Sequence, residues 1–164
     1  MSVIDKASLI QIPSGYKEGK LYSVKPTPTY GSELVTNGDF ATDSDWTKGS
    51  GVTISSGSAN FLNVANNQAL IQNGILSASK LYSVTFTISN YTQGGIRVGV
   101  STTNSTTISA NGTHTVELVS GTSFLNIYFY ATSTTTLSID NVSVKEVLID
   151  GDLNFTRASS ATRV

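Results

Sequence analysis

The chain has 164 residues, a formal net charge of −1 and 13% charged residues, against 38% hydrophobic residues. This length predicts one domain, or one domain with tails. The near-neutral charge excludes a basic surface for nucleic acid and electrostatic attraction to a membrane surface, so we expect neither partner. No apolar run reaches the roughly 18 residues that a membrane span needs. The absence of cysteine excludes a disulfide framework and thiolate metal sites.

Charge density divides the chain into three segments. The flanks, residues 1–32 and 148–164, hold 10 charged residues, and the longer segment 33–147 holds 11. All three prolines lie in the first flank, and residues 25–32 are typical of an extended linker because proline fixes φ and disfavours helix before it. Neither flank has an apolar pattern long enough to form a core. We therefore expect both flanks to gain order on a partner.

The segment 33–147 predicts an all-β fold in which short strands follow one another. Turn dipeptides such as Ser56-Gly57, Asn73-Gly74 and Asn111-Gly112 separate the strands. No helix is predicted. The spacing favours an antiparallel β-sandwich of two sheets. The predicted strands are Val52–Ser56, Ala59–Val64, Ala69–Asn73, Leu81–Ser89, Gly95–Ser101, Thr113–Val119, Phe124–Ala131 and Thr136–Val144.

Alternation of apolar and polar residues predicts which face of each strand is buried. In the strand 81–89 the inward residues are predicted to be Tyr82, Val84, Phe86 and Ile88. In the strand 96–100 Ile96, Val98 and Val100 are predicted inward, opposite Arg97 and Gly99. In the strand 124–131 Leu125, Ile127 and Phe129 are predicted inward, opposite Phe124, Asn126, Tyr128 and Tyr130.

Two motifs at the ends of this segment carry a resemblance. The segment opens with ELVTNGDF at 33–40, followed by Trp46, and closes with LSIDNVSVKEV at 137–147. This pair resembles the opening and final strands of the jelly-roll carbohydrate-binding modules attached to xylanases and cellulases. The resemblance implies a jelly roll that binds carbohydrate.

The flanks carry a second resemblance. IPSGYKEGKLYSVKPT at 12–27 and DGDLNFTRASSATRV at 150–164 are similar to adjoining parts of an N-terminal segment of bacteriophage virion proteins. The resemblance implies that a sandwich at 33–147 is inserted into an anchoring segment formed by 1–32 and 148–164. The leading hypothesis is a structural fibre or decoration protein at the phage particle surface, bound to capsid or tail proteins through its flanks. We expect it to form a homo-oligomer, with a trimer favoured, and to display a sandwich that can adhere to host or environmental glycans. The competing hypothesis is a free-standing carbohydrate-binding module.

The jelly-roll resemblance also implies a structural Ca²⁺ that ties the first strand to the last. The matching positions are Asn37 through its carbonyl, Asp39 and Asp140, with Asp43 or Asp45 nearby. Calcium takes six to eight oxygen ligands. The competing interpretation is that Asn37-Gly38 is a turn and that Asp140 caps a bulge by hydrogen bonds. No other cofactor is expected.

Carbohydrate recognition needs aromatic rings for the apolar faces of sugars and planar polar groups for their hydroxyls. Tyr128, Tyr130 and Asn126 are expected on one outer surface, beside Arg97, and Trp46 is a further candidate. A Trp at that position in the resembled family more often packs in the core. The competing interpretation is that Tyr128 and Tyr130 are cross-strand packing residues or lie under a neighbouring subunit.

Catalytic motifs are missing from the sequence. The single histidine, His114, cannot form a zinc-binding histidine pair. The sequence also has no Ser-His-Asp order and no Gly-x-Ser-x-Gly nucleophile elbow. Asp39, Asp43 and Asp45 form the one acidic cluster, which turn chemistry explains, and glycoside hydrolysis needs two acids held across a cleft. We therefore expect a protein that is not an enzyme.

Overall fold

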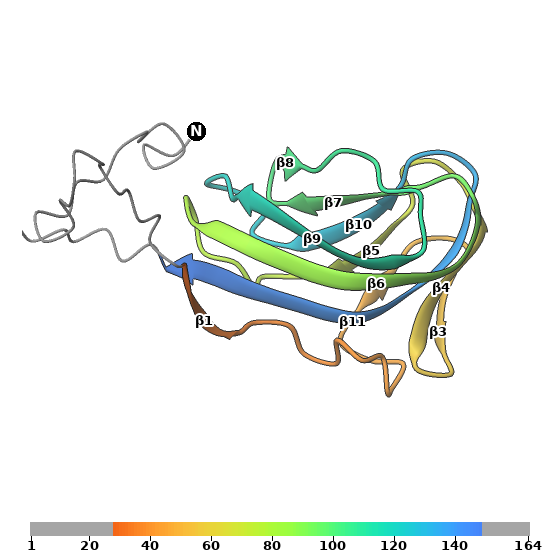
Figure 1. Cartoon of the computed structure of the whole chain (residues 1–164), viewed down its shortest axis with the longest axis horizontal. Coiled ribbons are helices and arrows are strands. Elements are labelled where there is room, and N and C mark those ends of the chain that lie inside the picture. The colour runs from red at the N-terminus through yellow and green to blue at the C-terminus, as the bar shows by residue number, and fades with distance from the viewer. Residues whose placement is uncertain (1–27, 149–164) are drawn as a thin grey trace, which may run out of the picture. The chain divides into compact units, whose positions relative to one another are not determined.

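A computed structural model describes residues 28–148, which form two antiparallel β-sheets and no helix (Figure 1). The predicted all-β sandwich is therefore confirmed. In this part of the chain no helix is long and apolar enough to span a membrane. The strands are β1 (Thr29–Glu33), β2 (Thr47–Lys48), β3 (Val52–Ser55), β4 (Ser58–Val64), β5 (Ala69–Gln72), β6 (Leu81–Gln93), β7 (Ile96–Val100), β8 (Thr103–Asn104), β9 (Gly112–Val119), β10 (Ile127–Ala131) and β11 (Thr135–Leu148).

The first sheet, here called sheet I, has six strands in the order β3-β4-β11-β6-β9, with β1 added along β11. The second, sheet II, has five strands in the order β2-β5-β10-β7-β8. The early half of β11 pairs with β4, and its later half lies beside β1, where the Leu34 N–H donates to the Val144 carbonyl at 3.0 Å. Figure 1 shows β1 running alongside β11. The first and last strands of the sandwich are therefore neighbours.

The core lies between the two sheets and is built from the predicted inward faces. All four residues predicted inward on β6 are buried, as are Ile96, Val98 and Val100 on β7. The rings of Phe86 on β6 and Phe129 on β10 meet edge to face at a centroid distance of 5.1 Å, which joins the sheets. Burying each such side chain contributes about 1.5–3 kcal/mol. Every buried polar side-chain atom of the described residues has a hydrogen-bond partner.

Most strands lie within a few residues of their predicted bounds, because turn residues with positive φ end them. Ser56 and Gly57 have φ of 54° and 69°, which is the two-residue turn that suits a β-hairpin between β3 and β4. The prediction for 124–131 was wrong at its start. Phe124 has a φ of 53° and 70% of its surface exposed, so the strand begins only at Ile127. Leu125 is partly buried and not a core residue of β10.

The sandwich includes β1, most of which the sequence assigned to the linker 25–32. The carbon that a side chain would add at Gly31 of β1 lies 3.6 Å from the Glu146 side chain on β11, so the two ends of the described sandwich lie together. An insertion of such a module separates the ends of its host only slightly. The flank motifs at 12–27 and 150–164 lie outside the described residues, so their anchoring role stays a prediction.

Candidate functional site

The outer surface of sheet II gathers three of the residues predicted for a site. Tyr128 and Tyr130 alternate outward on β10, and Arg97 on β7 is the register partner of Tyr130. The two tyrosine rings are stacked, with a centroid distance of 5.2 Å and an interplanar angle of 11°. Each ring therefore has one face against the other tyrosine and one face turned away from it.

A pocket of about 320 Å³ opens beside Tyr130. It is lined by Asn66, Asn67, Arg97, Asn104, Tyr130, Ala131 and Thr132. We call it the Arg97 pocket. The lining residues lie on or next to the strands β7, β8 and β10 and in the loop that joins β4 to β5. Its volume is near the lower end of the range for small-ligand sites, about 300–1,000 Å³.

The polar side chains of this pocket are available for a ligand. Within residues 28–148, the amides of Asn66, Asn67 and Asn104 and the guanidinium of Arg97 make no hydrogen bond or ion pair through their side chains. A primary amide offers two donors and an acceptor, and a guanidinium offers five donors. The arrangement therefore presents many free hydrogen-bonding groups beside one aromatic ring.

Gly99 gives the two tyrosines and Asn104 the space that they occupy. A side-chain carbon added at Gly99 would lie 2.6 Å from the Asn104 Oδ1 and 3.0 Å from the Tyr130 Cε2. Gly99 pairs with Tyr128 on one side and with Asn104 on the other. Its lack of a side chain lets Tyr130 lie over β7, at the edge of the pocket.

Tyr130 remains a neutral phenol. Its partial burial raises the pKa of its hydroxyl above the ordinary value of 10.0, and neighbouring Tyr128 raises it further. The hydroxyl therefore keeps its proton at neutral pH, and it serves as both donor and acceptor.

Asn126 supports the site from outside the pocket. Its amide Nδ2 donates to the Tyr128 hydroxyl at 2.8 Å, and its Oδ1 accepts from the Gly74 N–H at 2.7 Å. These two bonds hold Tyr128 and tie the start of β10 to the turn after β5. Asn126 does not line the pocket, so its predicted place beside the tyrosines corresponds to a positioning role.

Trp46 is not part of this surface, and its inclusion among the sugar-binding residues was wrong. The side chain is 6% exposed and packs against Phe40 and Phe129, with ring centroids 5.3 Å and 6.2 Å away. Its indole N–H donates to the Asn37 carbonyl at 3.0 Å. Trp46 is therefore a core residue and offers no exposed aromatic surface to a ligand.

Three asparagines of the pocket were missed from the sequence. Asn66 and Asn67 follow β4 in a loop, where Asn67 has a φ of 66°, and Asn104 lies in the two-residue strand β8. Consecutive asparagines signal a turn, because their side chains tolerate positive φ. Nothing in their spacing indicates that the chain brings this turn over the outer side of β10, which depends on the crossing from one sheet to the other.

The residues matching the calcium motif lie where the first and last strands meet. The Val142 N–H donates to the Gly38 carbonyl at 2.8 Å, and a side chain at Gly38 would fall 2.1 Å from the Val142 carbonyl oxygen. The opening motif NGDF and the closing motif DNVSV are therefore in direct contact. Close approach of the backbones explains the glycine.

The oxygen atoms named for calcium are engaged in hydrogen bonds. The Asn37 carbonyl accepts from the Phe40 N–H at 3.2 Å as well as from Trp46, which forms the turn of the competing interpretation. Asp140 accepts from the N–H and amide of Asn141, at 2.6 and 3.1 Å, beside a bulge in β11. Asp39 Oδ1 accepts from the Ala41 N–H at 3.3 Å.

These hydrogen bonds do not form a ready cage for a cation. Among residues 28–148, no three His, Cys, Asp or Glu side chains gather closely enough to hold a metal ion. Both lone pairs of the Asn37 carbonyl already have donors, so that atom does not fit the ligand role. Calcium binding at Asn37, Asp39 and Asp140 stays a prediction from the resemblance.

Comparison with known proteins gives structural relatives only, since no family model and no curated protein matches the sequence. A variant of a family 29 carbohydrate-binding module matches with a TM-score of 0.51 and 18% identity, over 73% of this chain and 92% of that one. The N-terminal cellulose-binding domain of Cellulomonas fimi β-1,4-glucanase C matches with a TM-score of 0.47 and 14% identity, over 73% and 99%. A CBM35 module from Paenibacillus barcinonensis matches with a TM-score of 0.44 and 17% identity, over 69% and 95%. The first similarity shows that the chain has the β-sandwich fold of a carbohydrate-binding module.

Proposed function

We propose that this protein is a non-catalytic carbohydrate-binding module whose ligand lies in the Arg97 pocket. The observation that carries the proposal is the pocket itself. It places the outward ring of Tyr130 beside three free asparagine amides and a free guanidinium. The similarity of the fold to carbohydrate-binding modules supports the same conclusion.

The chemistry of the lining suits a sugar. A pyranose ring has apolar C–H faces, which pack on an aromatic face, and hydroxyls around its rim, each of which donates and accepts. Small-molecule sites combine an apolar wall with a few convergent polar groups in this way. Because the amides have no partners in the described residues, a sugar gains hydrogen bonds without breaking any within the protein.

Hydrolysis of the bound sugar is not part of the proposal. Glycoside hydrolases hold two carboxyl groups across the scissile bond. The residues lining the pocket include no Asp or Glu. Binding, and not bond cleavage, is the activity that this lining supports.

The test is binding of the full chain to an array of neutral and acidic polysaccharides, with affinities then measured by isothermal titration calorimetry. Tyr130→Ala removes the aromatic wall and is expected to weaken binding about tenfold or more, since aromatic contacts contribute about 0.5–1.5 kcal/mol beyond their buried area. The matched control is Tyr30→Ala on β1, which removes a tyrosine that is 48% exposed on the other sheet. That variant should bind like the wild type.

Two results would overturn the proposal. One is a folded wild-type chain that binds no polysaccharide on the array. The other is binding that Tyr130→Ala leaves unchanged, which would place the ligand elsewhere on the sandwich. Unchanged circular dichroism of both variants excludes unfolding as the cause of any loss.

A virion role remains the sequence-based hypothesis for the biological setting of this module. The pairing of β1 with β11 favours insertion into a host segment, because both ends of the sandwich lie together. Copy number and position in a purified phage particle, from mass spectrometry and cryo-electron microscopy, test this hypothesis and the predicted trimer. Absence of the chain from particles would leave the free-standing carbohydrate-binding module as the better account.

A further inference from the structure

The charge of the Arg97 pocket comes from a single side chain. Arg97 is the one ionisable group other than the Tyr130 phenol among the lining residues. It is exposed, and no acidic residue lines the pocket to neutralise it. A ligand in this pocket therefore meets a positive charge that the lining leaves unbalanced.

Arg97 differs from the lysines of the sandwich. Residues 28–148 contain three lysines and this one arginine. Lys48 forms an ion pair with Asp43, and Lys80 forms one with Glu146 at 2.8 Å. Lys145 on β11, like Arg97, makes no ion pair in the described residues, but it lies on sheet I, away from the pocket lining. Among the residues that the structure describes, Arg97 is a positive charge without an ion-pair partner that lines the pocket defined above.

The shape of the Arg97 guanidinium limits the chemical class of ligand that the pocket favours. A guanidinium is planar and offers two parallel N–H groups that match the two oxygens of a carboxylate. Lysine offers a point charge without this preference. The neighbouring asparagine amides are neutral and suit hydroxyl groups, which every sugar carries. The one group in the lining that would distinguish an acidic sugar from a neutral one is therefore Arg97.

We infer that the Arg97 pocket binds the carboxylate-bearing sugar of an acidic polysaccharide, with the Arg97 guanidinium on the carboxylate and the Tyr130 ring on the sugar. This inference rests on the proposed function and specifies its ligand class. Arg97 is then the residue that determines specificity, and Tyr130 supplies affinity for any sugar.

The experiment compares acidic polysaccharides with their carboxyl-reduced forms. Polygalacturonate, alginate and hyaluronan serve as probes, and reduction converts each carboxylate into a hydroxymethyl group while keeping the rest of the chain. The full-length wild type is expected to bind at least one acidic probe about three- to tenfold more tightly than its reduced form, as a charge-assisted bidentate contact predicts. Arg97→Gln should abolish that difference and keep binding to the reduced form.

A matched control removes the same charge elsewhere. Lys145→Gln lowers the net charge by one unit on sheet I and should leave the preference for the acidic probe unchanged. A loss of preference in Lys145→Gln equal to that in Arg97→Gln would show an effect of net charge and would overturn the assignment to Arg97. Dextran sulfate bound as tightly as the best carboxylate probe would overturn the assignment to a carboxylate.

The outcomes separate this inference from the proposed function. Binding confined to neutral polysaccharides, or equal binding before and after reduction, overturns the acidic ligand and leaves carbohydrate binding in place. No binding to any polysaccharide overturns both.

Discussion

The outer faces of the two sheets carry similar polar residues but use them differently. On sheet I the hydroxyls of Thr85 and Thr115 lie 2.9 Å apart across β6 and β9, and those of Thr87 and Thr113 lie 3.1 Å apart. On β11 and β4 the Ser138 hydroxyl donates to the Asn60 amide oxygen at 2.8 Å. These polar groups bond to one another across neighbouring strands.

Sheet II leaves its polar groups without such partners around the Arg97 pocket. Asn66, Asn67 and Asn104 come from a loop and a short edge strand, where no neighbouring strand presents a matching group. A ligand over the paired hydroxyls of sheet I must compete with existing hydrogen bonds, whereas a ligand in the Arg97 pocket only replaces water. Composition alone therefore does not identify a binding face, and the hydrogen-bond pairing of its polar groups must be known as well.

The largest expected effect is a loss of stability from a substitution in the core that the two sheets share. Phe129 on β10 is fully buried and contacts Phe86 and Trp46. Phe129→Ala should lower the free energy of unfolding by about 3–5 kcal/mol, measured by urea denaturation, because it leaves a cavity between the sheets. Phe124→Ala is the control, since Phe124 is 70% exposed and its loss should change stability by about 0.5 kcal/mol or less. A loss below about 1 kcal/mol in Phe129→Ala would contradict the shared core.

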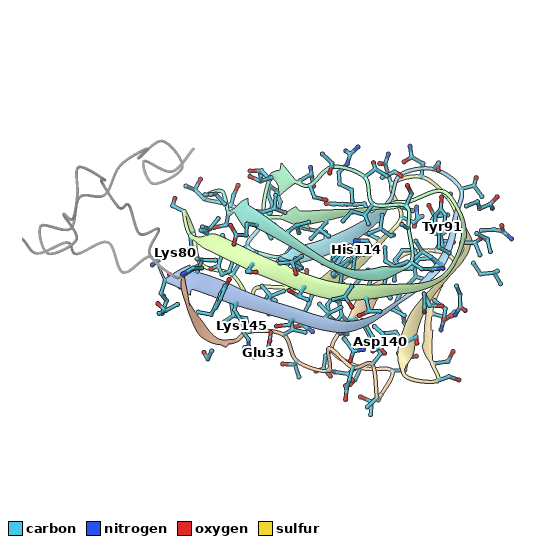
Figure 2. All side chains as sticks on the ribbon, in the orientation of Figure 1. Glu33, Lys80, Tyr91, His114, Asp140 and Lys145 are labelled. Atoms are coloured by element: carbon cyan, nitrogen blue, oxygen red, sulfur yellow. The ribbon has the colours of Figure 1, made fainter. Side chains whose placement is uncertain are left out.

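At the edge of sheet I, the carboxylate of Glu33 is likewise paired with groups of the protein itself. Figure 2 shows Glu33 beside β11. Its Oε1 accepts from the N–H groups of Leu34, Val35 and Val144, at 3.1, 3.1 and 2.7 Å, and its Oε2 accepts from the Ser143 hydroxyl at 2.5 Å. Partial burial raises the pKa of this carboxyl, but the four hydrogen bonds outweigh that effect and lower it below 4.5.

The lowered pKa predicts a loss of stability in acid. The carboxylate form is favoured in the folded protein, so its contribution is present above the ordinary pKa of 4.5 and is lost as the pH falls through the lower folded value. Glu33→Gln should cost about 1 kcal/mol or less at neutral pH, because the group is substantially exposed and screened by water. It should also flatten the stability profile below the ordinary pKa.

Urea denaturation of wild type and Glu33→Gln at several pH values measures both effects. Carbohydrate binding should not change, because Glu33 belongs to the internally paired sheet. Equal slopes of stability against pH for the two proteins would show that Glu33 is not held as its contacts indicate.

A substitution at Gly99 tests the Arg97 pocket on sheet II. In Gly99→Ala the new methyl group meets Asn104 Oδ1 at 2.6 Å and Tyr130 Cε2 at 3.0 Å, and both side chains must move. We expect polysaccharide affinity to fall about three- to tenfold, equivalent to about 1 kcal/mol, with the fold retained. Gly31→Ala on β1 is the control, since its nearest neighbour at 3.6 Å is an ordinary contact. Unchanged affinity in Gly99→Ala would mean that the ligand does not need the present positions of these two side chains.

The fold could be predicted from the sequence because its signals are local. Alternation placed Tyr82, Val84, Phe86 and Ile88 inward on β6, and all four are buried. Phe124 was misplaced because the backbone conformation at one residue, with a φ of 53°, overrides the alternation of its neighbours. The two-residue strand β2 pairs with β5, more than twenty residues further along the chain, and leaves no local pattern. The strand β8 pairs with the neighbouring β7, but its two residues are too few to show an alternation.

The site could be predicted only in part. Arg97, Tyr128 and Tyr130 were placed on one face because they alternate on strands with buried neighbours. The asparagines of the pocket were missed because a loop position has no periodicity, and its place over a sheet follows from topology. Trp46 was misassigned because a large aromatic residue serves equally as core or as binding surface, and only its contacts decide.

The smallest effect is expected on the paired face of sheet I. The double substitution Thr85→Val and Thr115→Val removes both members of one hydroxyl pair, so no donor or acceptor is left without its partner. Valine also favours strands, and the stability should change by about 0.5 kcal/mol or less. Polysaccharide affinity should equal that of the wild type in the same calorimetric assay. If binding falls instead, the paired hydroxyls contact the ligand, and the difference between the two faces would lie in their shape and not in the pairing of their polar groups.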